Sequence, residues 1–116
     1  MAKSPDTDAV FCANDDLALG VLFECRRRQI SIPEQMLVSG FNDLEFMAAS
    51  VPTLTSVRTN RYEMGRNAAT MVIEAMDGRR PENRVVDLGY TVMVRQSSVR
   101  PGQTVRAPAE RQSAAE

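Results

Sequence analysis

Three short apolar runs, each followed by polar or charged residues, dominate the first half of the chain. They span Ala9–Ala13, Met36–Phe41 and Leu54–Val57, and we expect each to form a buried strand. A helical pattern to about Arg28 separates the first run from the second. In an open parallel α/β sheet, small ligands bind at the carboxyl ends of the strands. The pattern therefore predicts a binding fold before it predicts an enzyme.

The second half of the chain predicts one more helix and further strands. Apolar residues recur at helical spacing over Arg61–Asp77, and the pattern stops at Gly78. Alternation over Arg84–Gln96 predicts one or two strands. We expect residues 1–8 to be a flexible N-terminus, and 101–116, rich in small and polar residues, to be a disordered tail.

Composition limits the chemistry that the chain can perform. A net charge of −1 over 116 residues argues against direct binding of a nucleic-acid backbone. The absence of histidine excludes Ser-His-Asp and Cys-His catalysis and every histidine-ligated metal site. We interpret Cys12 and Cys25 as small buried apolar residues in a reducing compartment, with a disulfide as the less favoured alternative. No signal peptide or membrane span is recognisable, so a cytoplasmic location is expected, and no cofactor or metal is indicated.

Polar side chains that follow the strands are candidates for ligand binding. Asn14 and Asn42 each offer a donor and an acceptor that suit sugar hydroxyls. Arg58 and Arg61 can hold a carboxylate or phosphate through parallel hydrogen bonds. The alternative for both arginines is a solvated loop or an ion pair with a nearby carboxylate; the candidates are Asp43, Glu45 and Glu63.

An enzyme remains an alternative at this point. Asp15, Asp16 and Asp43 could bind Mg²⁺ or act as acids and bases, but their spacing is unspecific and helix capping explains the first two. The sequence contains no Gly-rich phosphate loop. We therefore do not expect an enzyme.

Several motifs in a fixed order resemble the lactose/galactose repressor family over residues 8–100. They are Ala-Asn-Asp-Asp-Leu-Ala-Leu-Gly (13–20), Ile-Pro-Glu-Gln (32–35), Val-Ser-Gly-Phe-Asn-Asp (38–43), Pro-Thr-Leu-Thr-Ser-Val (52–57) and Arg95-x-Ser97. The run Gly-Phe-Asn-Asp-Leu-Glu-Phe, followed by Thr-Ser-Val-Arg-Thr, is most similar to the gluconate-operon repressors of that family.

This resemblance implies part of a type I periplasmic-binding-protein-like fold, an α/β, three-layer αβα arrangement around a parallel sheet. Residues 9–57 would belong to the C-terminal lobe of an effector-binding domain, and 58–100 would return to the N-terminal lobe. In the family, an effector bound between the lobes shifts their relative angle and so controls a transcription repressor. Operator DNA would be contacted only through a helix-turn-helix that this chain lacks.

The resemblance also implies which residues bind the effector. Asn14 and Asn42 match family effector contacts, Thr59 falls at another pocket position, Arg61 falls where other members place an aromatic ring, and Asp43 adjoins them. The family commonly has aspartate where Asn42 stands. Both replacements make the pocket more positive, so we expect a sugar acid such as gluconate, with Arg61 holding its carboxylate.

The first helix carries more apolar surface than one small core needs. The resemblance implies a homodimer that packs through this helix and the segment before Pro52; the expected interface residues are Leu19, Leu22, Phe23, Phe46, Met47 and Val51. The main functional alternative to a repressor portion is a stand-alone sugar-binding module for transport or chemosensing.

Overall fold

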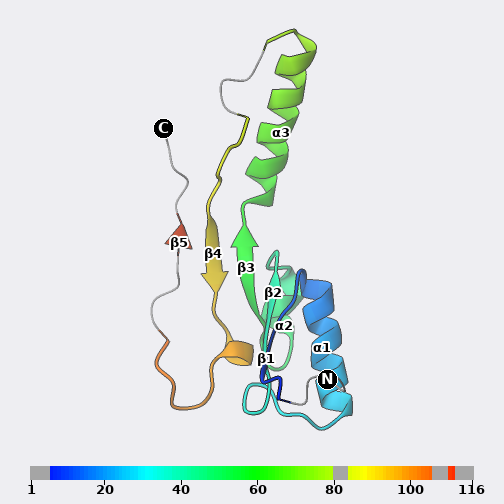
Figure 1. Ribbon diagram of the computed structural model, residues 1–116, viewed down its shortest axis with the longest axis vertical. Helices are drawn as coiled ribbons and strands as arrows, with labels where there is room; N and C mark the ends of the chain where they lie inside the picture. Colours follow the sequence, from blue (N-terminus) through cyan, green and yellow to red (C-terminus); the bar gives the residue numbers. More distant parts are fainter. Residues whose placement is uncertain (1–5, 80–83, 106–109, 112–116) are drawn as a thin grey trace.

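A computed structural model describes residues 6–79, 84–105 and 110–111 of the chain. Within these residues, five strands form one sheet in the order β1-β2-β3-β4-β5 (Figure 1). The elements are β1 (Ala9–Phe11), α1 (Asp15–Arg27), β2 (Leu37–Phe41), α2 (Glu45–Ala49), β3 (Thr55–Thr59), α3 (Arg61–Met76), β4 (Tyr90–Met93), the 3-10 turn η1 (Gln96–Ser98) and β5 (Glu110–Arg111). The three predicted strands and both predicted helices are confirmed.

The expected parallel sheet covers only part of the observed one. Strands β1, β2 and β3 are parallel, whereas β4 pairs with β3, and β5 with β4, in antiparallel fashion. The chain leaves along β3 and returns beside it along β4, and a neighbouring strand that returns in this way must run antiparallel. The sheet is therefore mixed, and the strand expected over Arg84–Gln96 is confined to Tyr90–Met93.

The two chain ends need a correction where the structure describes them. The carbonyl of Asp8 accepts the Leu37 N–H at 2.8 Å, so the last residue of the expected flexible N-terminus is joined to the sheet. Glu110–Arg111 pairs with β4 inside the segment expected to be disordered. Residues 1–5, 106–109 and 112–116 lie outside the described residues, so those parts of both expectations stay predictions.

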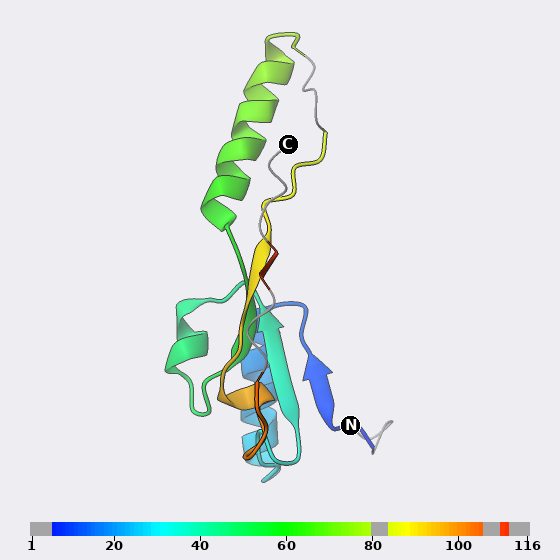
Figure 2. The ribbon, with the colours of Figure 1, turned by 90° about the vertical axis from the view of Figure 1, so that its left-hand side faces the viewer.

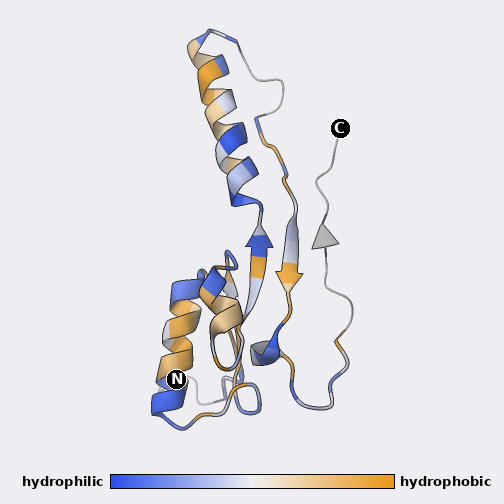
Figure 3. Cartoon of the chain, turned by 180° about the vertical axis from the view of Figure 1, so that it is seen from behind, coloured by the Kyte–Doolittle hydropathy of each residue, from blue (hydrophilic) through white to orange (hydrophobic). Residues whose placement is uncertain are grey.

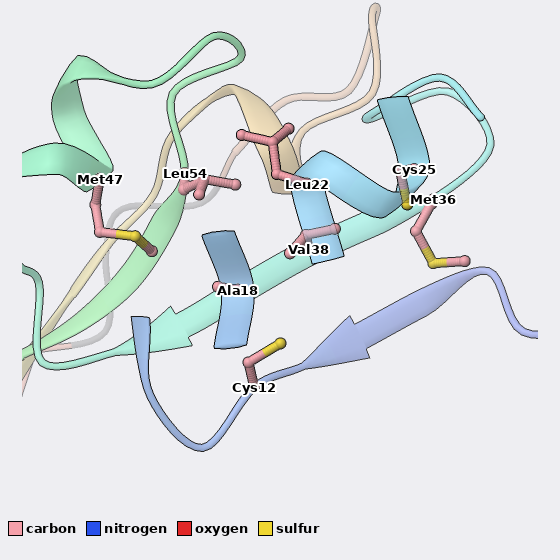
Figure 4. Close-up of a cluster of buried hydrophobic side chains, with 8 residues drawn as sticks. All are labelled: Cys12, Ala18, Leu22, Cys25, Met36, Val38, Met47 and Leu54. Carbon is pink, nitrogen blue, oxygen red and sulfur yellow. The ribbon is translucent and has the colours of Figure 1, made fainter. Parts of the chain in front are cut away.

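The hydrophobic core lies between α1, the sheet and α2 (Figure 4). Asn14 starts α1, because its side-chain Oδ1 accepts the Leu17 N–H at 2.9 Å. The buried apolar residues are Cys12, Ala18, Leu22, Cys25, Met36, Val38, Met47 and Leu54. Both cysteines are free, and burial raises the pKa of each thiol, so they act as the small apolar residues that we predicted.

Helix α3 and the return segment 84–89 form an arm that extends away from the compact part (Figure 2). The molecule measures 58 × 29 × 27 Å. No residue of α3 is buried, although its far end is strongly apolar (Figure 3). Val72, Ile73 and Met76 are exposed by 58%, 58% and 82%. Within the described residues, this apolar surface has no cover.

Candidate functional site

One buried carboxylate joins the carboxyl ends of the first three strands. Asp15, at the start of α1, is fully buried and accepts the Leu44 N–H at 2.6 Å through Oδ2 and the Ser56 hydroxyl at 2.7 Å through Oδ1. The same Ser56 Oγ accepts the Asp43 N–H at 3.0 Å. Asp15 therefore ties the helix that follows Asn14 to the loop after β2 and to strand β3.

The loop after β2 has an uncommon backbone. Asn42 and Asp43 have φ angles of 109° and 54°, in the region that non-glycine residues rarely occupy and that Asn and Asp tolerate best. The Asn42 N–H donates to the Val57 carbonyl at 2.9 Å, which fixes the loop against β3. Uncommon backbone angles of this kind cluster at ligand-binding segments, so the loop after β2 is a candidate ligand-binding segment.

The carboxylate of Asp43 holds two arginines from different strands. Arg58 approaches Oδ2 through Nε and through a terminal nitrogen, both at 2.7 Å. A terminal nitrogen of Arg95 lies 2.7 Å from Oδ1, an ion pair in which the N–H is not aligned for a hydrogen bond. Another Arg95 nitrogen donates to the Leu54 carbonyl at 2.7 Å. The ion-pair alternative for Arg58 is therefore the one that the structure contains.

This arrangement corrects the expected role of Asp43. Its side chain is only 3% exposed and each of its oxygens faces an arginine, so it has little capacity to accept a hydrogen bond from a ligand. We assign Asp43 a positioning role, in which it holds Arg58 and Arg95. The expectation of direct effector contact then rests on the other predicted residues.

The remaining predicted residues differ in the contacts that their side chains make. Asn14 uses its side-chain oxygen to cap α1, which leaves its amide nitrogen as the group that can reach a ligand. Thr59 ends β3 and Arg61 begins α3, where the chain leaves for the arm. The Arg61 side chain is exposed and forms no hydrogen bond or ion pair with the residues that the structure describes.

The carboxylates of the enzyme alternative are bound to other groups of the chain or face solvent. The Asp15 carboxylate accepts the Leu44 N–H and the Ser56 hydroxyl, the Asp43 carboxylate pairs with two arginines, and Asp16 is exposed. Among the described residues, no group of three or more His, Cys, Asp or Glu side chains could hold a metal ion. The described part of the chain also contains no helix that is long and apolar enough to span a membrane.

The expected dimer residues divide between a groove and the core. Leu19, Phe23, Phe46 and Val51 line a mostly apolar groove between α1 and the segment 46–51, which includes the C-terminal end of α2, with Leu22 at its base and Arg26 also in its wall. Leu22 is 5% exposed and Met47 is fully buried, so both pack inside the chain. Met47 is therefore a core residue, and a partner could contact only the groove residues.

Sequence patterns missed two parts of the site. The buried role of Asp15 was hidden, because its position at a helix start already explained an acidic residue. Arg95 stood in a recognised motif without an assigned role. In the structure, Ser97 of that motif accepts the Thr55 N–H and donates to the Val38 carbonyl, so the motif fastens the returning strand to β2 and β3.

Known proteins with similar sequences are transcription regulators. The chain is 41% identical over 92 residues to the HTH-type transcriptional regulator IdnR of Escherichia coli, and 42% identical over 98 residues to the HTH-type transcriptional regulator GntR of Pseudomonas aeruginosa. These alignments cover 79% and 84% of this chain but only 28% and 29% of the two regulators. The chain thus spans less than a third of their length.

Solved structures agree with the sequences. The transcription regulator GntR of Chromobacterium violaceum matches with a TM-score of 0.72 and 44% identity, over 84% of this chain and 36% of that one. A LacI-type transcription regulator of Bifidobacterium animalis matches with a TM-score of 0.74 and 30% identity, over 85% and 35%. Residues 1–98 match the model of the periplasmic-binding-protein-like domain. The chain therefore belongs to the periplasmic-binding-protein-like domain family, in the form found in regulators of the lactose/galactose repressor type.

Proposed function

We propose that the chain is the effector-sensing and dimerisation portion of a transcription repressor that responds to a sugar acid such as gluconate. The observation that carries this proposal is the network at the strand ends, where Asp15 places the residues after β1 and β2 beside β3. The similar regulators support the class of protein. A repressor acts on DNA, so we place the protein in the cytoplasm.

The division between two lobes is part of this proposal. We assign residues 9–57 to the C-terminal lobe and 58–100 to the segment that returns to the N-terminal lobe. The uncovered apolar side of α3 supports this assignment, because a further piece of sheet would cover it. Operator DNA would be contacted through a helix-turn-helix outside this sequence.

The proposed ligand contacts follow from the polar groups that the structure leaves accessible. The Asn14 amide nitrogen and the Asn42 amide would bind hydroxyls, Thr59 would add a hydroxyl contact, and Arg61 would approach the carboxylate. No cofactor is needed for this binding. The effector would shift the equilibrium between two lobe arrangements by binding one of them more tightly.

Calorimetric titration of the chain with gluconate, and separately with glucitol, tests the effector class. Glucitol has the same carbon chain with a neutral alcohol in place of the carboxylate. We expect gluconate to bind at least about tenfold more tightly, since one charge-assisted hydrogen-bonded pair contributes about 1.5–3 kcal/mol. Equal affinities, or no binding of either compound, would contradict the proposal.

The apolar groove between α1 and the segment 46–51 is the proposed dimer surface. Val51 at its rim is 81% exposed, so Val51→Asp leaves the core intact while it places a charge in the interface. We expect this change to weaken the dimer by about 100-fold, because the new carboxylate would lose its water in a groove that is lined mostly by apolar side chains. Sedimentation equilibrium measures the effect.

Val85→Asp is the matched control for the dimer experiment, because Val85 is 86% exposed but lies on the arm. It should leave the dimer constant within about twofold, as exposed substitutions away from an interface usually do. A Val51→Asp protein that still dimerises as the parent does would show that the groove is not the interface.

A further inference from the structure

We infer that Arg58, more than Arg61, selects an acidic ligand over its neutral analogue, and that Asp43 holds Arg58 in the orientation for this task. This inference rests on the proposed function, since it names the group of the same site that recognises the carboxylate. Arg58 lies within β3, beside the loop that carries Asn42.

The guanidinium of Arg58 is fixed on one side and open on the other. Its Nε and one terminal nitrogen face Oδ2 of Asp43, both at 2.7 Å. Its second terminal nitrogen has no partner among the residues that the structure describes, and the side chain is 55% exposed. A guanidinium that is already oriented loses less side-chain freedom when it binds a carboxylate than a mobile one does.

The accessible positive charge of the cluster lies on Arg58. The Asp43 carboxylate faces two guanidinium groups, those of Arg58 and Arg95, while the carboxylate of Asp15 in the same network is fully buried behind Ser56. Arg95 is only 15% exposed, and its terminal nitrogens already face the Leu54 carbonyl and Asp43. Arg58 is therefore the arginine of this cluster that a ligand carboxylate can reach.

Neighbouring groups explain why a hydroxylated acid fits better than a simple anion. Asn42 is joined to Val57, the residue before Arg58, by its own N–H. Its side chain forms no hydrogen bond within the described part of the chain. A carboxylate held by Arg58 would thus place the next carbons of the ligand beside an amide that can bind hydroxyls. This chemistry is that of an aldonic acid.

Arg61 provides the contrast. It is also exposed, but no carboxylate among the described residues orients it, so it must lose more freedom on binding. We therefore expect Arg58→Gln to reduce the preference for acid more than Arg61→Gln does.

The test measures the dissociation constants of gluconate and glucitol for the full chain and its variants by calorimetry. In Arg58→Gln, we expect the preference for gluconate over glucitol to fall at least tenfold, while the affinity for glucitol changes less than twofold. Arg66→Gln is the control, since Arg66 is an arginine on α3 that is 69% exposed and whose side chain pairs with Glu63 among the described residues. It should leave both affinities unchanged.

A second variant separates orientation from net charge. Asp43→Asn increases the net positive charge of the cluster, and asparagine tolerates the φ of 54° at this position. If net charge alone determined the preference, gluconate would bind more tightly to Asp43→Asn. We expect weaker binding of gluconate, by about fivefold or more, because Arg58 loses its fixed orientation.

The outcomes distinguish this inference from the proposed function. A chain that binds neither compound contradicts both. A chain that prefers gluconate, and whose Arg58→Gln variant keeps that preference, overturns the role of Arg58 and leaves the proposed function standing. Tighter gluconate binding by Asp43→Asn overturns the positioning role of Asp43. Far-UV circular dichroism of each variant confirms that it is folded.

Discussion

Asp15→Ala is expected to remove most of the stability of the compact part of the chain. The carboxylate is fully buried and accepts hydrogen bonds from the Leu44 N–H and the Ser56 hydroxyl. Without it, a backbone donor is left in the interior with no acceptor, and each such loss costs about 1–3 kcal/mol. We expect a loss of about 3–5 kcal/mol, a large fraction of the total stability of a small domain.

Asp16→Ala is the matched control for this substitution. Asp16 is the next residue of the same helical turn, but it is exposed and its side chain forms no hydrogen bond or ion pair among the described residues. Its removal affects only the favourable interaction with the helix dipole, about 0.3–1 kcal/mol. Urea unfolding followed by circular dichroism measures both changes. Similar losses of unfolding free energy in the two variants would contradict the central role of Asp15 in joining the strand ends.

Gly40→Ala should have the second largest effect. A Cβ at this position in β2 would overlap Asp15 Oδ1 and would lie 2.9 Å from Met47 Cε and 3.2 Å from Ala18 Cβ. The methionine end can move, but the carboxylate is held by its two partners. We expect a destabilisation of about 2–3 kcal/mol, as for an extra methyl group in a filled interior. The Asp15 carboxylate, and the Leu44 and Ser56 groups that donate to it, should move to make room for the methyl group.

Gly20→Ala is a control in which we expect the stability to rise instead of fall. Gly20 lies inside α1, and an added Cβ there would meet nothing within 4 Å. Because alanine is the better helix former, this variant should be more stable by about 0.5–1 kcal/mol. Thermal and urea unfolding of both variants give the comparison. A Gly40→Ala protein as stable as the parent would mean that the strand is less closely packed against Asp15 than the structure shows.

Local sequence patterns were sufficient for the elements and insufficient for their contacts. The strand ending at Phe41 and the helix ending before Gly78 follow from hydrophobic periodicity and from the residues that stop a helix. The partners of Asp15 lie 29 and 41 positions away, at Leu44 and Ser56. No local pattern encodes such a distant pair, so Asp15 could be interpreted only as a helix-start residue.

The same limit applies to Arg58 and Arg61, whose partners the sequence does not reveal. Arg58 and Arg61 look alike in the sequence, and both a ligand contact and an ion pair are consistent with their type. The structure places Arg58 against Asp43 and leaves Arg61 without a described partner. The buried position of Met47 was also unpredictable, because core and interface residues are both apolar.

The most direct test of the proposed function locates the ligand on the molecule. Amide chemical shifts of the ¹⁵N-labelled chain are recorded while gluconate is added. We expect the largest changes at Asn14, Asn42, Arg58, Thr59 and Arg61, with little change in the groove at Leu19 and Phe23. Changes that are absent from the strand ends, or that are confined to the groove, would contradict an effector site at the carboxyl ends of β1, β2 and β3.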